Sequence, residues 1–250
     1  MKNLLRAEFL KLKGNWLVTL SFVIAFLLPF LTLAMTLFSN QIDLAEETVF
    51  HIVLRQNHIF LTLMVCNLLF SLMVTNLFCK EFQYGTIDDI LSIPVKRSSF
   101  LIAKELTIFI WMMAIGLFSF CICLIIGAVF GLEGFNLQTI LYGLVRYVLA
   151  VTISIIPLQL IIWASVLFKN YVISLAVSIV ALVGSIVAFN TKDIIFIYPF
   201  SISFVLTNFK TAVLPEQVIT SLISLGILGV ICIFGIFISF NRMDIKSHAV

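Results

Sequence analysis

Side chains of the kinds that carry out catalysis are few in this chain and lie far apart. The three histidines are His51, His58 and His248, and none belongs to an HExxH metal motif. The chain also contains no GxSxG nucleophile motif and no GxxxxGK[ST] loop, whose backbone N–H groups and lysine would hold nucleotide phosphates. We therefore expect no enzyme, no metal site and no cofactor in this chain. Any ATP that drives it must be hydrolysed by a different protein.

The charged segment 80–98 has the most informative pattern, KEFQYGTIDDILSIPVKRS. Ile87, Ile90 and Leu91 share one face of a helix, and Pro94 would end that helix. The pattern predicts a short amphipathic helix that lies against the membrane face and exposes its polar side. Such a helix either contacts another protein or merely covers the end of a helical bundle, and the residues alone favour neither.

The composition indicates a membrane protein that holds this segment between apolar helices. Hydrophobic residues make up 62% of the 250 residues and charged residues 11%, where a soluble domain has roughly 45–50% and about 25%. The mean hydropathy is +1.20. Because about 20 apolar residues cross a bilayer as a helix, we predict an all-α fold, one transmembrane domain over 1–250. Its six spans are predicted at about 15–38, 58–79, 106–130, 147–168, 171–189 and 217–240.

The basic residues predict the orientation. With the N-terminus in the cytoplasm, eleven of the fifteen lysine and arginine residues fall in inside segments, whereas the acidic residues divide equally. This asymmetry follows the positive-inside rule. We expect both termini in the cytoplasm. A formal net charge of +3 gives no reason to expect a nucleic-acid partner.

Three connecting segments have predicted structures of their own. Before Gly14, Leu5, Phe9 and Leu12 form a stripe, which predicts an interfacial helix or an ordinary basic flank of the first span. The segment 169–170 predicts a tight hairpin between spans four and five. The stretch 194–206 is too short to span and too apolar for a free loop, so we predict a re-entrant or interfacial element, broken by Pro199.

The spans carry two polar or small-residue stripes and no charge in their interiors, because Glu105 and Arg146 are placed at span ends. One stripe either lines a substrate path or binds a neighbouring helix: Asn67, Ser71 and Thr75. The other favours close helix packing: Ser174, Ser178, Ala181 and Ser185. Few polar groups argue against a wide hydrophilic pore, and an apolar or amphipathic cargo fits better.

The segment after span two resembles the signature loop of ABC-2 type transporter permeases. The resemblance rests on Glu81-x-x-Tyr84-Gly85-Thr86-Ile87, on Leu91-Ser92-Ile93-Pro94-Val95-x-Arg97, and on Lys104 at the start of the next span. It implies that the loop is a coupling helix that docks into a cytosolic ATPase and passes its movement to the spans. The coupling residues implied are Glu81, Tyr84, Gly85, Thr86, Ile87, Pro94 and Arg97.

Within that family, the chain is most similar to bacitracin-resistance permeases, with lantibiotic-immunity permeases close behind. The resemblance implies the membrane subunit of an exporter in the bacterial cytoplasmic membrane. A separate ABC ATPase subunit would bind ATP and Mg, and a second permease copy would complete a dimer. The cargo would be a peptide antibiotic or its lipid-carrier complex, reached through the membrane lipid. Export of sodium or another small solute, and a non-transporting scaffold, are the alternatives.

Overall fold

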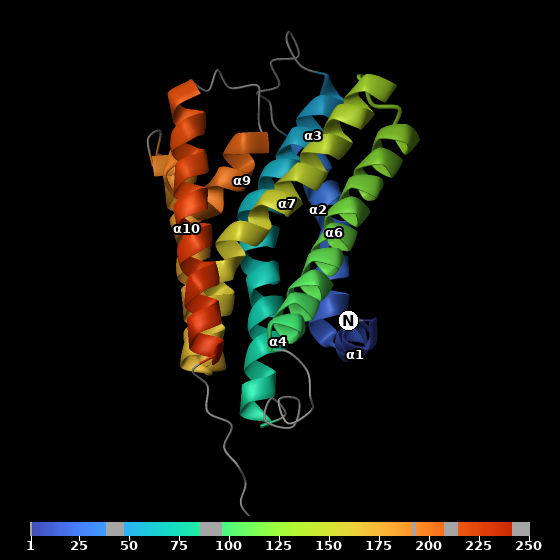
Figure 1. Cartoon of the computed structure of the whole chain (residues 1–250). Coiled ribbons are helices and arrows are strands. Elements are labelled where there is room, and N and C mark those ends of the chain that lie inside the picture. The colour runs from blue at the N-terminus through green and yellow to red at the C-terminus, as the bar shows by residue number, and fades with distance from the viewer. Residues whose placement is uncertain (1, 39–47, 86–96, 192–193, 208–214, 242–250) are drawn as a thin grey trace, which may run out of the picture.

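The computed structural model describes residues 2–38, 48–85, 97–191, 194–207 and 215–241, and all regular elements in these residues are helical. Six helical segments are long and apolar enough to cross a membrane (Figure 1). This confirms the predicted all-α architecture with six candidate spans. The segments are α2 (Trp16–Phe38), a continuous helix formed by α3 (Val49–Phe60), η1 (Leu61–Leu69) and α4 (Phe70–Gln83), then α6 (Arg97–Val129), α7 (Leu137–Phe168), α8 (Tyr171–Phe189) and α10 (Pro215–Asn241).

Three of these helices begin about nine or ten residues earlier than the predicted spans: at Val49, Arg97 and Leu137. The predicted limits followed the apolar runs, and the helices extend beyond those runs. A helix can continue past the apolar run once neighbouring helices or water satisfy its polar side chains. At 1.5 Å per residue, a helix of 32 residues exceeds the ~30 Å hydrocarbon core by several turns.

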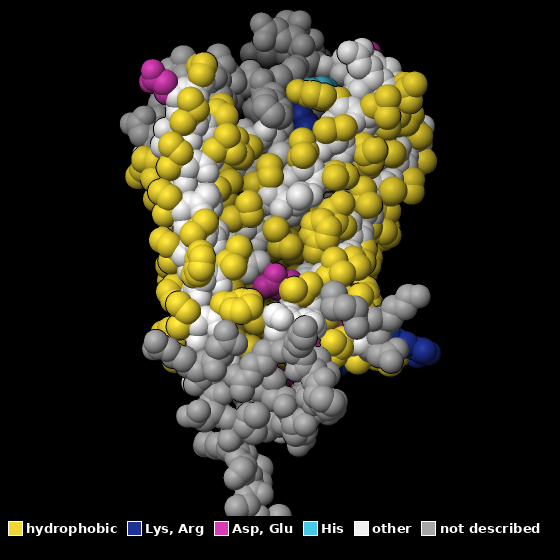
Figure 2. All heavy atoms as spheres, in the orientation of Figure 1, with side chains coloured by type: hydrophobic (Ala, Val, Ile, Leu, Met, Phe, Trp, Pro, Cys, Tyr) yellow, Lys and Arg dark blue, Asp and Glu magenta, His cyan; other side chains and the backbone are white. Residues whose placement is uncertain are grey.

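Helix α7 lies at the centre of the bundle, where it contacts α4, α6 and α10 (Figure 1). Large buried aromatic side chains fill the space around it, including Tyr147, Phe120 and Phe70. Helices α8 and α10 are mostly exposed in the isolated chain. On the face in Figure 2, hydrophobic side chains cover most of the described length of the bundle, as expected for a surface that meets lipid or another membrane helix.

A π-helix, η1, interrupts the second span and packs against a short buried helix, α9 (Pro199–Thr207). A single 3₁₀ turn, η2 (Ile194–Phe196), precedes α9. A short helical element therefore precedes the last span, and the apolar stretch is interrupted where Pro199 begins α9. Its re-entrant or interfacial position stays a prediction. Proline is well suited to the first helical position, where its missing N–H would have no partner within the helix.

The hairpin between α7 and α8 has the predicted two-residue connection. Lys169 ends α7 in a left-handed conformation, with φ 51°, and the Asn170 side chain accepts a hydrogen bond from the Val172 N–H at 2.9 Å. All four residues of the predicted small stripe on α8 are buried, and Ser174 and Ser185 contact the second span through Cys79 Sγ and the Leu63 carbonyl. The packing interpretation of this stripe is confirmed.

The first helix, α1 (Lys2–Leu12), packs against the bundle through a stripe that contains Glu8 and Leu12. Both residues are buried, whereas Phe9 is 39% exposed and Leu5 is half-buried. The interfacial position of Leu5, Phe9 and Leu12 stays a prediction. A carboxylate lies in the buried stripe, which requires a cationic partner inside the bundle.

Candidate functional site

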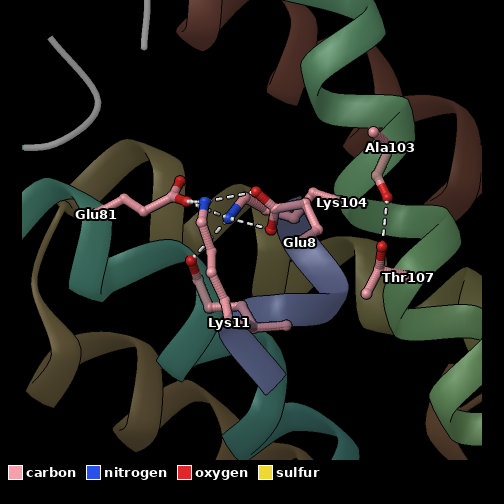
Figure 3. A network of polar contacts seen from close by, with 7 residues as sticks. Glu8, Lys11, Glu81, Ala103, Lys104 and Thr107 are labelled. Atoms are coloured by element: carbon pink, nitrogen blue, oxygen red, sulfur yellow. Dashed lines mark hydrogen bonds and ion pairs between the residues drawn. The ribbon is translucent and has the colours of Figure 1, made fainter. Parts of the chain in front are cut away.

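Four charged side chains from three helices meet at the end of the bundle where α1 lies (Figure 3). Helix α1 supplies Glu8 and Lys11, the last turn of α4 supplies Glu81, and the first part of α6 supplies Lys104. We call these four residues the ion cluster. Two carboxylates and two ammonium groups give it a formal charge of zero.

The cluster is connected in a closed pattern, because each cation contacts both acids. Lys104 Nζ lies 3.3 Å from Glu8 Oε2 and 2.9 Å from Glu81 Oε1. Lys11 Nζ lies 2.5 Å from Glu8 Oε1 and also pairs with Glu81 Oε1. The cluster therefore joins α1, α4 and α6 by ion pairs that cross between segments far apart in the sequence.

Lys104 is completely buried, and its surroundings compensate for the loss of water. Its ammonium group donates to the Leu77 carbonyl at 2.9 Å. It also lies 5.1 Å from the ring centre of Phe78 and 5.2 Å from that of Phe100, within the range of cation–π attraction. Removing one member of such a buried set leaves a charge without compensation, which typically costs about 3–5 kcal/mol.

Lys11 holds its charge firmly, although it is the most exposed member of the cluster. Burial by itself lowers the pKa of an ammonium group, but hydrogen bonds and the negative charges of Glu8 and Glu81 outweigh it. The net effect raises the pKa of Lys11 above its ordinary value of 10.5. Lys11 therefore stays protonated at neutral pH and keeps its pairing with both acids.

The described part of the predicted coupling element continues directly from this cluster. Glu81 is buried, whereas Tyr84, three residues later, is 74% exposed and ends α4. Gly85 follows with φ +68°, and a side-chain Cβ at this position would meet no atom within 4 Å. Within this chain, Gly85 is thus suited to its position by its backbone conformation and not by close packing.

The other predicted coupling residues lie outside the described residues or have no described side chain. Thr86, Ile87 and Pro94 lie outside the described residues, as does the predicted helix they would form. Arg97 is the first residue of α6, but its side chain is not described. The role of these residues in docking stays a prediction.

The predicted polar stripe of the second span points into the bundle. Asn67, Ser71 and Thr75 are at most 3% exposed. Asn67 Nδ2 donates to the Leu63 carbonyl at 2.9 Å and to the Phe200 carbonyl of α9 at 3.3 Å, and Ser71 Oγ donates to the Asn67 carbonyl at 2.5 Å. The contact with Phe200 joins the second span to α9, and the other two lie within the second span. A substrate path along this stripe stays a prediction.

A charged side chain is buried within α7, at the end of its apolar run. Arg146 is 6% exposed, and its guanidinium donates to the Tyr142 hydroxyl at 2.8 Å and lies over the Tyr142 ring. His58 of α3 is buried nearby and is hydrogen-bonded to Thr207 of α9 at 3.1 Å. Arg146 ends the apolar run but not the helix, because α7 begins at Leu137.

Sequence reasoning missed the roles of Glu8, Lys11 and Lys104 in the ion cluster. One signal was present: Leu5, Glu8 and Leu12 are spaced by three and four residues, so an acid occupies the apolar stripe of α1. That spacing indicates a buried acid, and Lys11 lies only three residues after Glu8 and pairs with it. The second partner, Lys104, lies 96 residues away and could not be found from local spacing.

Comparison with known proteins shows the family to which this sequence belongs. A family model described as an ABC-2 family transporter protein matches residues 4–187, which include the entire ion cluster. The chain belongs to the ABC-2 transporter family. As an ABC-2 protein with six membrane-spanning candidates, it is a multi-pass membrane protein and a permease subunit of an ABC transporter. Family membership also implies association with an ABC ATPase.

The chain is also similar to the bacitracin transport permease protein BCRB of Bacillus licheniformis. The two sequences are 24% identical over 190 residues, which cover 75% of this chain and 89% of that relative. The shared length shows that the similarity extends over most of the transmembrane region and is not confined to one motif.

Proposed function

We propose that this ABC-2 chain is the membrane subunit of an exporter that protects bacteria against a membrane-active peptide antibiotic of the bacitracin type. A separate ATPase subunit provides the energy. The transporter removes from the membrane either the peptide or the complex of the peptide with its lipid carrier. Support for the cargo comes from the relative, whose name describes bacitracin transport.

The ion cluster explains how movement of the ATPase would reach the membrane helices. It fixes α1 and the start of α6 to the last turn of α4, immediately before exposed Tyr84 and Gly85. A movement that the ATPase imposes on the segment after Gly85 would therefore be applied to three helices together. Without the cluster, the end of α4 would move without α1 and α6.

The membrane-facing surface supports an apolar cargo. A groove of about 650 Å³ lies between α2 and the second span, and its lining has no exposed polar surface. Leu28 and Met35 contribute from one side, and Met64 and Leu68 from the other. Such a groove suits a hydrocarbon chain and offers nothing to coordinate a small ion.

Growth inhibition tests the proposal directly. A sensitive Gram-positive host would express this chain with its cognate ATPase and be challenged with bacitracin, a lantibiotic or high sodium. We expect protection against bacitracin that disappears with an ATPase-inactive partner. Protection against the lantibiotic alone, or against sodium alone, would show that the cargo is that compound and not bacitracin. Protection that persists with the inactive ATPase would overturn ATP-driven export.

A further inference from the structure

A cavity of about 380 Å³ lies beside the ion cluster, where α1, the start of α2 and the end of α4 meet. Its lining includes Lys13 and Asn15 from the α1–α2 connection, Trp16 at the start of α2, and Lys80, Glu81 and Tyr84 from the end of the second span. This volume falls in the usual range for small-ligand sites. The cavity therefore has room for a polar group larger than water.

The charges of the lining favour an anion. Glu81 is the acidic residue of the lining, and Lys11 and Lys104 already neutralise it. Lys13 and Lys80 form no hydrogen bond or ion pair through their side chains with residues that the structure describes. Two lysine side chains thus line the cavity without an acidic partner in the described chain.

The aromatic residues place the cavity at the level of the membrane surface. Trp16 is the first residue of the first candidate span and is 64% exposed, and Tyr84 is 74% exposed at the end of the second. Tryptophan and tyrosine concentrate where lipid headgroups meet hydrocarbon. The Trp16 ring would contact acyl chains beside a headgroup that enters the cavity.

We propose that this cavity binds the phosphate headgroup of an anionic phospholipid, with the ammonium groups of Lys13 and Lys80 on the phosphate oxygens. Basic pockets between membrane helices commonly recognise such headgroups. A bound lipid would contact both the α1–α2 connection and the end of α4, and so would stabilise the arrangement that the ion cluster maintains. The inference does not depend on the proposed function, since the distribution of lysine and arginine predicts the cytoplasmic leaflet for this end.

A lipid fits the cavity better than a carboxylate of the ATPase does. Trp16 is the first residue of a candidate span, and tryptophan concentrates where lipid headgroups meet hydrocarbon. A lipid headgroup therefore has direct access to the cavity. The segment after Gly85, which lies beyond the end of α4, is the more accessible surface for the ATPase.

Native mass spectrometry of the full-length chain, purified in detergent without the ATPase, tests the proposal. The probes are dioleoyl phosphatidylglycerol and dioleoyl phosphatidylcholine. We expect tighter binding of phosphatidylglycerol, and about thirtyfold weaker binding in the double variant Lys13→Gln, Lys80→Gln. Binding of phosphatidylcholine should not change. The matched control is Arg6→Gln with Lys169→Gln, which removes two basic charges outside the cavity and should retain the preference.

Several results would overturn the proposal. These are equal affinity for the two lipids in the wild type, unchanged phosphatidylglycerol binding in the cavity variant, or an equal loss in the control. Competition by glycerol 1-phosphate at the same concentration as the lipid would show that the site takes free phosphate esters and not lipid. Because the assay contains neither antibiotic nor ATPase, its failure would leave the export proposal intact, and failure of the growth test would leave this one intact.

Discussion

A lysine with no exposed surface is stable here because two carboxylates, a carbonyl and two aromatic rings surround it. The Lys104→Met variant keeps most of the side-chain volume but leaves Glu8 and Glu81 with only Lys11 between them. We predict a loss of stability of about 3–5 kcal/mol, measured as a lower midpoint of thermal unfolding in detergent.

The control for this prediction restores the charge balance with a second substitution. Adding Glu8→Gln to Lys104→Met leaves one acid, Glu81, with one base, Lys11, so the double variant should be more stable than the sum of the single effects predicts. Arg6→Met, on the exposed side of α1, should have little effect. Additive losses would show that the four charges do not act as one cluster.

Gly85 offers a test that separates backbone conformation from steric fit. No atom of the described residues lies within 4 Å of a Cβ at this position, so valine and asparagine both have space among them, but the φ of +68° disfavours valine far more than asparagine. We predict that Gly85→Val reduces antibiotic resistance while ATP hydrolysis by the assembled complex continues, and that Gly85→Asn keeps most of both. Equal resistance in the two variants would contradict a coupling role for this conformation.

The ion cluster could be predicted only in part from the sequence. Glu81 belongs to a recognisable motif, but its partners Lys11 and Lys104 are brought to it only by tertiary packing. Local patterns report burial along one helix, and they contain no information on which distant helix supplies the opposite charge. Arg146 ends the apolar run but lies within α7, since hydropathy locates the hydrocarbon and not the end of the helix.

At the scale of elements, close packing of α8 against the second span was predictable because small residues recur on one face. Ser178 is completely buried on that face, whereas Val180 is 69% exposed on the other. We predict that Ser178→Leu destabilises the chain by about 1–3 kcal/mol through overpacking, as measured by thermal unfolding. Val180→Leu adds a similar apolar group on the exposed face and should have almost no effect. Similar losses in both variants would contradict the packing role of the stripe.

The π-helix η1 could not be predicted, because its nine residues are ordinary apolar and polar types. Its wider turn changes which side chains face α9, and Asn67 binds a carbonyl of α9 from within it. Isolated π-helical segments occur frequently at functional sites. The backbone geometry where η1 packs against α9 therefore depends on contacts between helices and not on the helix propensity of the local sequence.

At the scale of the whole molecule, the distribution of lysine and arginine predicts that α1 and the ion cluster face the cytoplasm. An even number of spans places both termini on that side, and Glu133, in the connection between α6 and α7, on the opposite side. We predict that a membrane-impermeant thiol reagent labels Glu133→Cys in intact Gram-positive cells, but labels Arg6→Cys only after permeabilisation.

The native sequence suits this experiment, because all five cysteines lie within apolar helices and four are buried. The wild-type chain therefore provides the background signal, and both substituted positions are exposed. The reverse labelling pattern would place the ion cluster and Gly85 outside the cell, away from any ATP. Coupling through the end of α4 would then be impossible, because an ABC ATPase can act only where α4 meets the cytoplasm.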